Sequence, residues 1–312
     1  MAQPSNQLAG FLAVYAQKSL EQFIADMPLI SRFTTDFSDT ITNGGVSVTT
    51  RLPTTVFSTP NDTAANGYLA SSATASAITI TLKQRDYTED FTELQWATMT
   101  PQMLQNTFLP SMVKQLANGI VVDALSLITG SLVSPALDIV NVTGSNATSV
   151  FSASAALTNN EVPFADRMMI TSPAAYQSLI GSINPAYVYG ATTAIQDYHG
   201  IKVGGFDPIF EYPRLNNVSP PPGGSYFSTA YATGKTLAGI AIQKQGLCIA
   251  MRSPIDINNG LVQTATATDP TSGISIQVRL MYDIPRGVWK IAVTSIYGVA
   301  LGNTKAIVPI VY

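Results

Sequence analysis

The sequence predicts an α+β fold for this chain of 312 residues. Three features carry the prediction: a long helical repeat in residues 101–129, alternating apolar and polar residues at 46–52 and 77–83, and a succession of helix and strand signals across 153–215. Both periodicities occur in one chain, so helices and sheets are expected together.

An amphipathic helix is predicted over residues 5–26, and Pro28 ends it. Its apolar face recurs at near-helical spacing through Leu8, Leu12, Tyr15, Ser19, Phe23 and Met27. Because this helix precedes every other element, we interpret residues 1–42 as an arm that docks on a neighbouring subunit. The alternative is a helix that covers the core of its own chain.

A two-stranded hairpin is predicted next. The 53–76 stretch between its two alternating segments is rich in Thr, Ser, Ala and Gly and is too long for an ordinary loop. We interpret it as an extended finger, with a hairpin at the edge of a compact sheet as the alternative. Four acidic residues follow near its base: Asp86, Glu89, Asp90 and Glu93. A solvated acidic strand edge is favoured there, and a divalent cation bound between subunits is the alternative.

The strongest helical signal spans residues 101–129. Its apolar positions repeat every four residues, at Leu104, Phe108, Met112, Leu116, Ile120, Ala124 and Ile128. Gly130 ends the repeat, and Pro110 predicts either a kink or a fresh helix beginning near Leu109.

Residues 153–215 carry local signals with identifiable physical causes. They begin with a short helical turn at 154–157, an extended Val162-Pro163 pair, and an apolar strand at 167–170 whose Arg167 stays in water. A helix follows from the cap Ser172 and Pro173 to Gly181. The last expected elements are a weaker helix at 191–198 and two short strands within 201–211, joined at Gly204-Gly205.

The remainder is predicted to be strand and loop. The expected elements are a Pro-rich surface loop at 219–224, a buried strand around Cys248, a loop at 264–272, and strands at 274–283, 288–300 and 307–311. A single cysteine cannot form an internal disulfide, so Cys248 is interpreted as an inert core thiol.

One series of short phrases also carries a resemblance. The phrases are Val162-Pro163, then Arg167-Met168-Met169-Ile170, then Pro173-Ala174-Ala175-Tyr176, then Gly200-Ile201-Lys202-Val203-Gly204-Gly205-Phe206. In this order and spacing the chain resembles the major capsid proteins of tailed bacteriophages, the Hong Kong 97-like family, and is nearest its P22-coat-like branch. The resemblance implies an N-terminal arm (1–42), an E-loop hairpin (43–95), a peripheral domain with a long spine helix (96–152), an axial domain (153–264) and return strands of the peripheral domain (265–312).

The same resemblance implies self-assembly as hexamers and pentamers into an icosahedral head around double-stranded DNA, in the cytoplasm of the host. Separate scaffolding and portal proteins, with decoration proteins in addition, would be its partners, and no membrane would be involved. In some relatives a lysine on the finger forms a covalent cross-link to the next subunit. No lysine occurs from Arg51 to Leu82, and Lys83 stands at the finger's base, so we predict a shell without cross-links.

Composition independently favours a chain that other chains cover. Charged residues make up 11% of the sequence, against about 25% in an average soluble protein, and 46% are hydrophobic. The formal net charge of −3 argues against a protein that binds nucleic acid by neutralising phosphates.

The sequence contains no convincing catalytic, cofactor or metal site, so we predict that the protein is not an enzyme. The single His199 lies in a turn and suits a polar surface position, and one Cys with one His cannot supply a zinc site. Gly234-Lys235-Thr236 is similar to the end of a phosphate-binding loop. The glycine that this loop requires five residues earlier is Thr229 here, which excludes the motif.

Three alternatives remain open at this point. An encapsulin, a protein-loaded shell, would share the fold and differ in its contents. An outer-membrane β-barrel would fit the low charge and the terminal Tyr312, but the helix at 101–129 and the lack of a signal-peptide pattern argue against it. A hydrolase with an unrecognised carboxylate site has no supporting motif.

Overall fold

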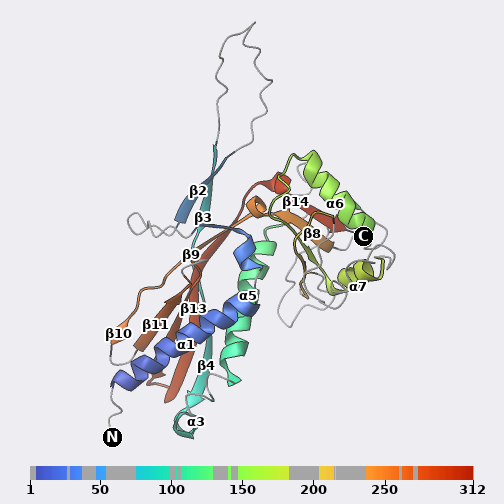
Figure 1. Cartoon of the computed structure of the whole chain (residues 1–312). Coiled ribbons are helices and arrows are strands. Elements are labelled where there is room, and N and C mark those ends of the chain that lie inside the picture. Colours follow the sequence, from blue (N-terminus) through green and yellow to red (C-terminus); the bar gives the residue numbers. More distant parts are fainter. Residues whose placement is uncertain are drawn as a thin grey trace, which may run out of the picture.

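Two sheets and one separate two-stranded hairpin organise the described part of the chain in this computed structural model (Figure 1). The structure describes residues 5–26, 29–36, 47–53, 75–98, 103, 107–128, 140–141, 147–182, 204–213, 215, 237–259, 262–269 and 273–311. The predictions for 191–198, 201–203, 219–224 and 234–236 lie outside these residues.

The larger sheet contains seven described strands. Six follow the order β1 (Thr34–Asp36), β9 (Leu247–Arg252), β13 (Val288–Leu301), β12 (Ser275–Asp283), β11 (Val262–Thr268) and β10 (Asn258–Asn259), and β4 (Lys83–Thr92) also pairs with β13. All pairs are antiparallel except β1 with β9. The predicted strands at 274–283 and 288–300 are confirmed.

The predicted loop at 264–272 is wrong for most of its length. Residues 262–268 form β11, which pairs with β12 from Val262 to Thr268. The Thr-Ala alternation of this segment is a period-two strand pattern, and its alanines pack against the core. The low hydrophobicity of this segment is typical of a loop. The segment nevertheless forms a strand, because a strand beside bulkier neighbours needs only small residues on its buried face.

Two helices cover one face of the larger sheet (Figure 1). The first, α1 (Ser5–Asp26), packs on β11, β12 and the second helix, and it buries Leu12, Tyr15 and Phe23. Its bounds match the predicted helix, and Lys18 and Glu21 are exposed as the pattern requires. The apolar face expected to dock on a neighbouring subunit is instead covered by its own chain, so the alternative interpretation is correct.

The second helix, α5 (Leu109–Leu125), begins at the residue where the sequence allowed a fresh start. Pro110 lies in its first turn, where a missing N–H costs no hydrogen bond. The helix ends five residues before Gly130. It is buried on nearly all sides because it lies between α1 and strands β4 and β13. Among the described helices, none combines the length and apolar content needed to cross a bilayer.

The smaller sheet has five described strands, in the order β5 (Val140–Asn141), β14 (Ile307–Val311), β8 (Leu237–Gln243), β6 (Arg167–Thr171) and β7 (Ile209–Glu211). Helices α6 (Ala147–Asn159) and α7 (Pro173–Ser182) accompany it. The strand at 167–170 and the helix from Pro173 are confirmed, and the Ser172 Oγ accepts a hydrogen bond from the Ala175 N–H at 3.3 Å. The helix predicted at 154–157 is longer than expected.

Arg167 is not in water, contrary to prediction. It is 1% exposed, and its guanidinium donates hydrogen bonds to the carbonyls of Pro163, Ser154 and Val162. The Val162 and Pro163 carbonyls lie in the turn that follows α6, where they would otherwise need solvent, and the bond to Ser154 ties the same charge to the helix.

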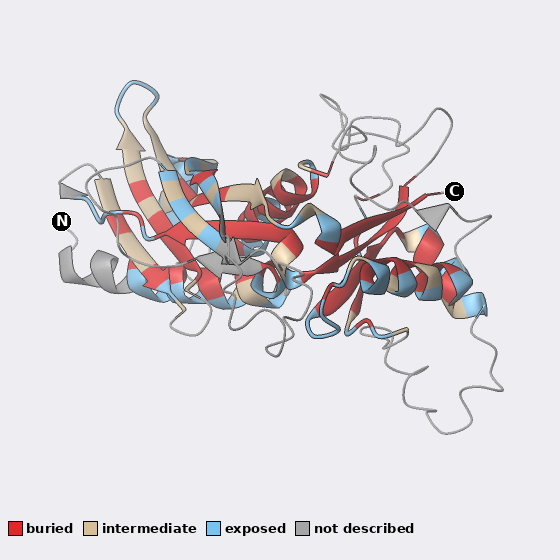
Figure 2. Cartoon of the chain, turned by 90° about the horizontal axis from the view of Figure 1, so that it is seen from above, coloured by how far each residue is buried: buried red, intermediate tan, exposed pale blue. Residues whose placement is uncertain are grey.

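Two adjacent turns each carry the chain from one sheet to the other. The first is η4 (Lys244–Gly246), between β8 and β9, and the second is η5 (Thr304–Ala306), between β13 and β14. The Gly302 N–H donates to the Gly246 carbonyl at 2.9 Å, which joins the crossings. At these turns the chain leaves one sheet for the other, so β9 belongs to the larger sheet and the last strand, β14, to the smaller one. Figure 2 shows buried positions continuing through both sheets.

Candidate assembly site at the base of the hairpin

The predicted hairpin is confirmed as a separate two-stranded ribbon (Figure 1). Strand β2 (Ser47–Pro53) pairs antiparallel with β3 (Ala75–Thr81), from Ser47 opposite Thr81 to Pro53 opposite Ala75. Residues 54–74, most of the predicted finger, lie outside the described residues. Only Leu82 separates β3 from β4, so one continuous ribbon leads from the hairpin into the larger sheet.

The base of the hairpin packs on a platform of small residues, on the sheet face opposite the helices. Ile80 shares a hydrophobic cluster with Cys248 and Ala250 of β9, and half-buried Val48, Ile78, Leu82 and Ala300 pack against it. Gly298 of β13 completes the platform, because a Cβ at this position would lie only 2.4 Å from the Thr81 carbonyl oxygen. Small side chains therefore allow β3 to cross close over β13. Cys248 is 1% exposed, as expected for a core thiol.

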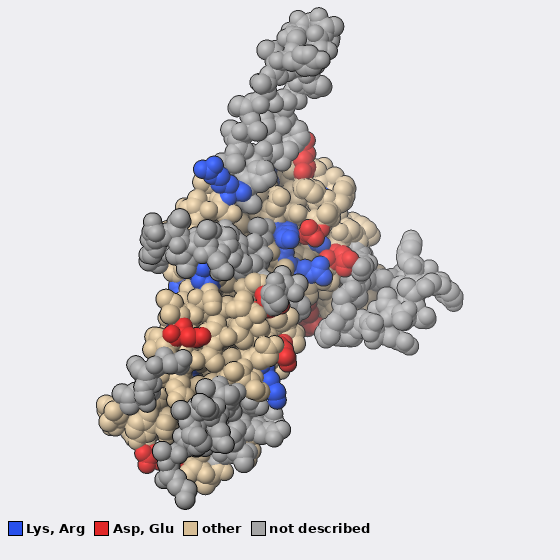
Figure 3. Space-filling view, turned by 60° about the vertical axis from the view of Figure 1, so that its left-hand side comes forward, with Lys and Arg blue, Asp and Glu red and all other residues tan. Residues whose placement is uncertain are grey.

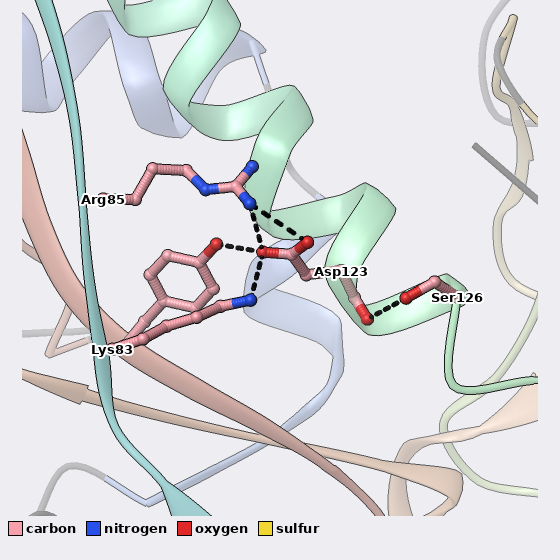
Figure 4. A network of polar contacts seen from close by, with 5 residues as sticks. Lys83, Arg85, Asp123 and Ser126 are labelled. Atoms are coloured by element: carbon pink, nitrogen blue, oxygen red, sulfur yellow. Dashed lines mark hydrogen bonds and ion pairs between the residues drawn. The ribbon is translucent and has the colours of Figure 1, made fainter. Parts of the chain in front are cut away.

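A polar cluster lies on the opposite face of the sheet, the one that the helices cover, and is centred on Asp123 of α5 (Figure 4). The Lys83 Nζ lies 2.7 Å and the Arg85 Nη2 2.9 Å from the Asp123 Oδ2, and the Arg85 Nη2 also donates to Oδ1 at 3.1 Å. The Tyr297 hydroxyl of β13 donates to the same carboxylate. One side chain thus joins α5 to β4 and β13.

The electrostatics of the cluster follow from its partial burial. Burial, followed by the hydrogen bond to Asp123, raises the pKa of Tyr297 above its ordinary value, so the phenol stays neutral and remains a donor. The Asp123 side chain is 18% exposed, while Lys83 is 47% exposed and lies over the Tyr297 ring at 5.4 Å from its centroid. Two cations and one phenol therefore hold a single carboxylate that water reaches only in part.

The structure does not gather the four acidic residues into a cation site. Alternation along β4 leaves Asp86 and Asp90 exposed and turns Glu89 to the half-buried face. The Asp90 Oδ2 lies 3.7 Å from the Arg286 Nη1. Glu93, in α3 (Glu93–Thr98), accepts a hydrogen bond from the Tyr282 hydroxyl at 2.6 Å. Within the described ranges, no group of three His, Cys, Asp or Glu residues could hold a metal ion.

The other chemical candidates give no site in the described structure. His199 and the 234–236 segment lie outside the described residues. Sequence reasoning missed Asp123, Arg85 and Tyr297 as a group. One signal was present, since Asp123 is the only charged residue between Gln115 and Thr129, within an otherwise apolar helix. Its partners could not be identified because they lie 38 and 174 residues away in sequence.

Comparisons with known proteins give a fold without a family. No family model matches the sequence, and no curated protein matches it. Among solved structures, the chain is similar to the capsid of Ralstonia phage GP4, with a TM-score of 0.55, 10% identity, and coverage of 90% of this chain and 86% of that chain.

Two further structures give the same result. The mature capsid of bacteriophage PhiM1 has a TM-score of 0.53 and 12% identity, covering 89% of this chain and 87% of that chain. The capsid of cyanophage P-SCSP1u has a TM-score of 0.52 and 12% identity, covering 89% and 86%. Over most of its length, this chain therefore has the fold of these phage capsid proteins.

Proposed function

We propose that copies of this chain assemble as hexamers and pentamers into an icosahedral shell that encloses phage double-stranded DNA. The observation that carries the proposal is the fold, which is similar over 86% and 87% of the lengths of capsid chains from Ralstonia phage GP4 and bacteriophage PhiM1. This likeness covers nearly the whole of each chain, not one module.

Two features of the subunit support the proposal, because each would be stabilised by contact with another subunit. A two-stranded ribbon is marginally stable in water, so the β2–β3 hairpin needs a neighbour beyond its base. Large apolar side chains are exposed on both parts of the body, among them Leu94 at 76%, Phe164 at 67% and Ile255 at 85%. On the face that Figure 3 shows, uncharged residues make up most of the described surface, with Lys, Arg, Asp and Glu scattered among them. Surfaces of this kind are expected where other subunits pack.

The proposed parts follow the Hong Kong 97-like plan. The larger sheet with α1 and α5 would be the peripheral domain, with α5 as its spine helix, and the smaller sheet with α6 and α7 would be the axial domain. The β2–β3 hairpin would be the E-loop. In this assignment the domain boundary lies at η4 and η5.

The proposed role is structural, in the virion, after assembly in the host cytoplasm. No catalytic, cofactor or metal residue is assigned. Scaffolding, portal and decoration proteins are the proposed partners. The net charge of −3 suits an inner wall that lies near packed DNA without binding it through neutralised phosphates.

The proposal is tested by expressing the full chain, alone and with a candidate scaffolding protein, and imaging the soluble fraction by negative-stain electron microscopy. Closed shells or curved sheets of hexameric units are the expected result. Particles from infected cells should contain nuclease-protected DNA, whereas an enzyme cargo would replace the proposal with an encapsulin. A monodisperse small species in every condition would contradict shell formation.

A further inference from the structure

We infer that Asp123 is the positioning residue of the hairpin, and that it clamps the start of β4 to α5 and so fixes the direction in which the β2–β3 ribbon leaves the subunit. The biological use of this clamp rests on the proposed shell function. The clamp itself is a property of the single chain and can be measured without assembly.

The clamp acts at the start of β4, at the base of the hairpin. Lys83 and Arg85 are the first and third residues of β4, directly after Leu82, where the ribbon leaves the hairpin. Both contact the same carboxylate of α5, at 2.7 and 2.9 Å. α5 is buried on nearly all sides, so it holds the Asp123 carboxylate at a fixed position.

Two glycines clear the path of the ribbon. Gly119 lies one helical turn before Asp123 on the same face of α5, and a Cβ there would lie 2.3 Å from the Arg85 Nη1. Gly298 does the same on β13, where a Cβ would lie 2.4 Å from the Thr81 carbonyl oxygen. A Cβ at Gly119 would force the Arg85 side chain to move, and one at Gly298 would meet the Thr81 backbone of the ribbon, so close approach on both sides is built into the site.

Few other contacts hold the base of the hairpin in place beside the clamp. Of the hairpin residues whose burial is described, only Ile80 is fully buried, and it rests on Cys248 and Ala250. A contact area this small opens more readily than the core beneath it. Release of Asp123 should therefore open the hairpin base locally and uncover Cys248, while the larger sheet stays folded.

The test uses Cys248, the single cysteine, as a reporter in the full-length chain. Asp123→Asn keeps the shape of the side chain but removes its charge, and we expect the rate of Cys248 alkylation by iodoacetamide, without denaturant, to rise by about tenfold. The matched control is Asp283→Asn, which removes the 2.7 Å pair with Lys290 on the same sheet, away from the hairpin. It should leave the alkylation rate unchanged.

A second variant separates the clamp from the stability of the fold. Gly119→Ala favours the helix by about 1 kcal/mol through propensity, yet its Cβ must move Arg85 away from Asp123. It should therefore also raise the alkylation rate. Measurements at several low urea concentrations distinguish the two routes, because local opening depends weakly on urea and global unfolding depends steeply on it.

The outcomes separate the clamp from the shell function. Rates in Asp123→Asn and Gly119→Ala equal to that in Asp283→Asn would overturn the clamp, whatever the unaltered chain assembles into. A rise in both variants would support it even if electron microscopy showed no shells, and in that case only the proposed function would fail. If both proposals are correct, the two variants should form fewer or misshapen shells, and the control should form normal ones.

Discussion

At the scale of single residues, buried polar groups distinguish this chain. Arg167 is among the largest fully buried side chains in the described structure, and it donates hydrogen bonds to three backbone carbonyls and to the hydroxyls of Ser154 and Thr158. Its guanidinium also lies 4.3 Å from the centre of the Phe164 ring. Burial lowers the pKa of Arg167, but guanidinium remains protonated in proteins. Arg167 thus holds the end of α6, the following turn and the start of β6 together.

Arg167→Met should therefore destabilise the subunit by about 2–4 kcal/mol, because several buried carbonyls lose a charged donor. The measurement is guanidinium chloride unfolding followed by circular dichroism. Arg286→Met is the control, since Arg286 is 69% exposed in a 3.7 Å pair and should change stability by no more than about 0.5 kcal/mol. Equal midpoints in the two variants would contradict the assigned role.

Buried tyrosines predict a loss of stability in alkali. Burial, followed by the charge of Glu89, raises the pKa of Tyr15 above its ordinary value of 10.0. The unfolded chain therefore ionises this phenol first, so its contribution is complete below pH 10 and is lost progressively as the pH rises further. Tyr15→Phe should make the decline in the unfolding midpoint between about pH 9 and 11 shallower. The same slope in both proteins would show that Tyr15 does not contribute.

At the scale of elements, the crossings between the sheets at η4 and η5 behave as one joint. The Gln243 side chain accepts a hydrogen bond from the Gln245 N–H at 2.8 Å, and the Asn303 side chain accepts one from the Lys305 N–H at 3.1 Å, so each turn is capped. Gly246 lies where both crossings meet, and a Cβ there would lie 2.8 Å from side-chain atoms of Ile242 and Ile307. Close packing at this glycine fixes how one sheet continues into the other.

Gly246→Ala should destabilise the subunit by about 1–3 kcal/mol, because the added methyl overpacks a closed site. Gly181→Ala is the matched control. It lies in α7 with no heavy atom within 4 Å of the added Cβ, so the better helix propensity of alanine should be neutral or stabilising. Thermal unfolding compares the two variants. If Gly246→Ala lowered the unfolding temperature no more than Gly181→Ala does, the joint would be more loosely packed than the structure indicates.

The hairpin gives a second prediction at this scale. Replacing residues 54–74 with Asn-Gly would close β2 and β3 with a two-residue turn that suits an antiparallel pair. Because the base is anchored by the platform and by Asp123, the shortened subunit should fold with an unchanged unfolding midpoint. It should fail to form stable shells in electron microscopy, since the proposed contact with the neighbour is lost. Normal shells from this variant would refute the finger assignment.

At the scale of the whole molecule, the proposed shell depends on many modest contacts, not on chemistry. Several interfaces per subunit stabilise one another, since each bound contact raises the effective concentration of the next. The chain carries no lysine from Arg51 to Leu82, and Lys83 is paired with Asp123. The Lys83 ammonium forms its ion pair within its own subunit, so we expect no covalent cross-link from it to a neighbouring subunit.

Purified particles boiled in detergent with reductant should therefore run as a single band at the 33.1 kDa of the monomer. The measurement is gel electrophoresis of intact particles, with unassembled subunit in the adjacent lane. A ladder of larger species that survives boiling would show covalent bonds between subunits and contradict the prediction.

Much of the local structure could be predicted because periodicity is a local property. The helix at 5–26, the helix from Pro173 and the strand pair β12–β13 follow from spacing and caps alone. β11 was missed because alternating Thr and Ala carry little hydrophobic contrast. The candidate site was only half predicted: the hairpin was found from its alternation, and the carboxylate that holds it was not.

The sequence by itself determined the helix at 5–26, the helix from Pro173, the hairpin strands and the long strands near the C-terminus, together with a resemblance to phage capsid proteins. Only the tertiary structure decided what covers each face. It placed α1 on its own sheet, returned β14 to the smaller sheet, buried Arg167 among carbonyls and brought Lys83, Arg85 and Tyr297 to Asp123. The reason is physical: an apolar or charged face requires a partner, but any segment of suitable shape can provide one, and chain topology selects which segment does.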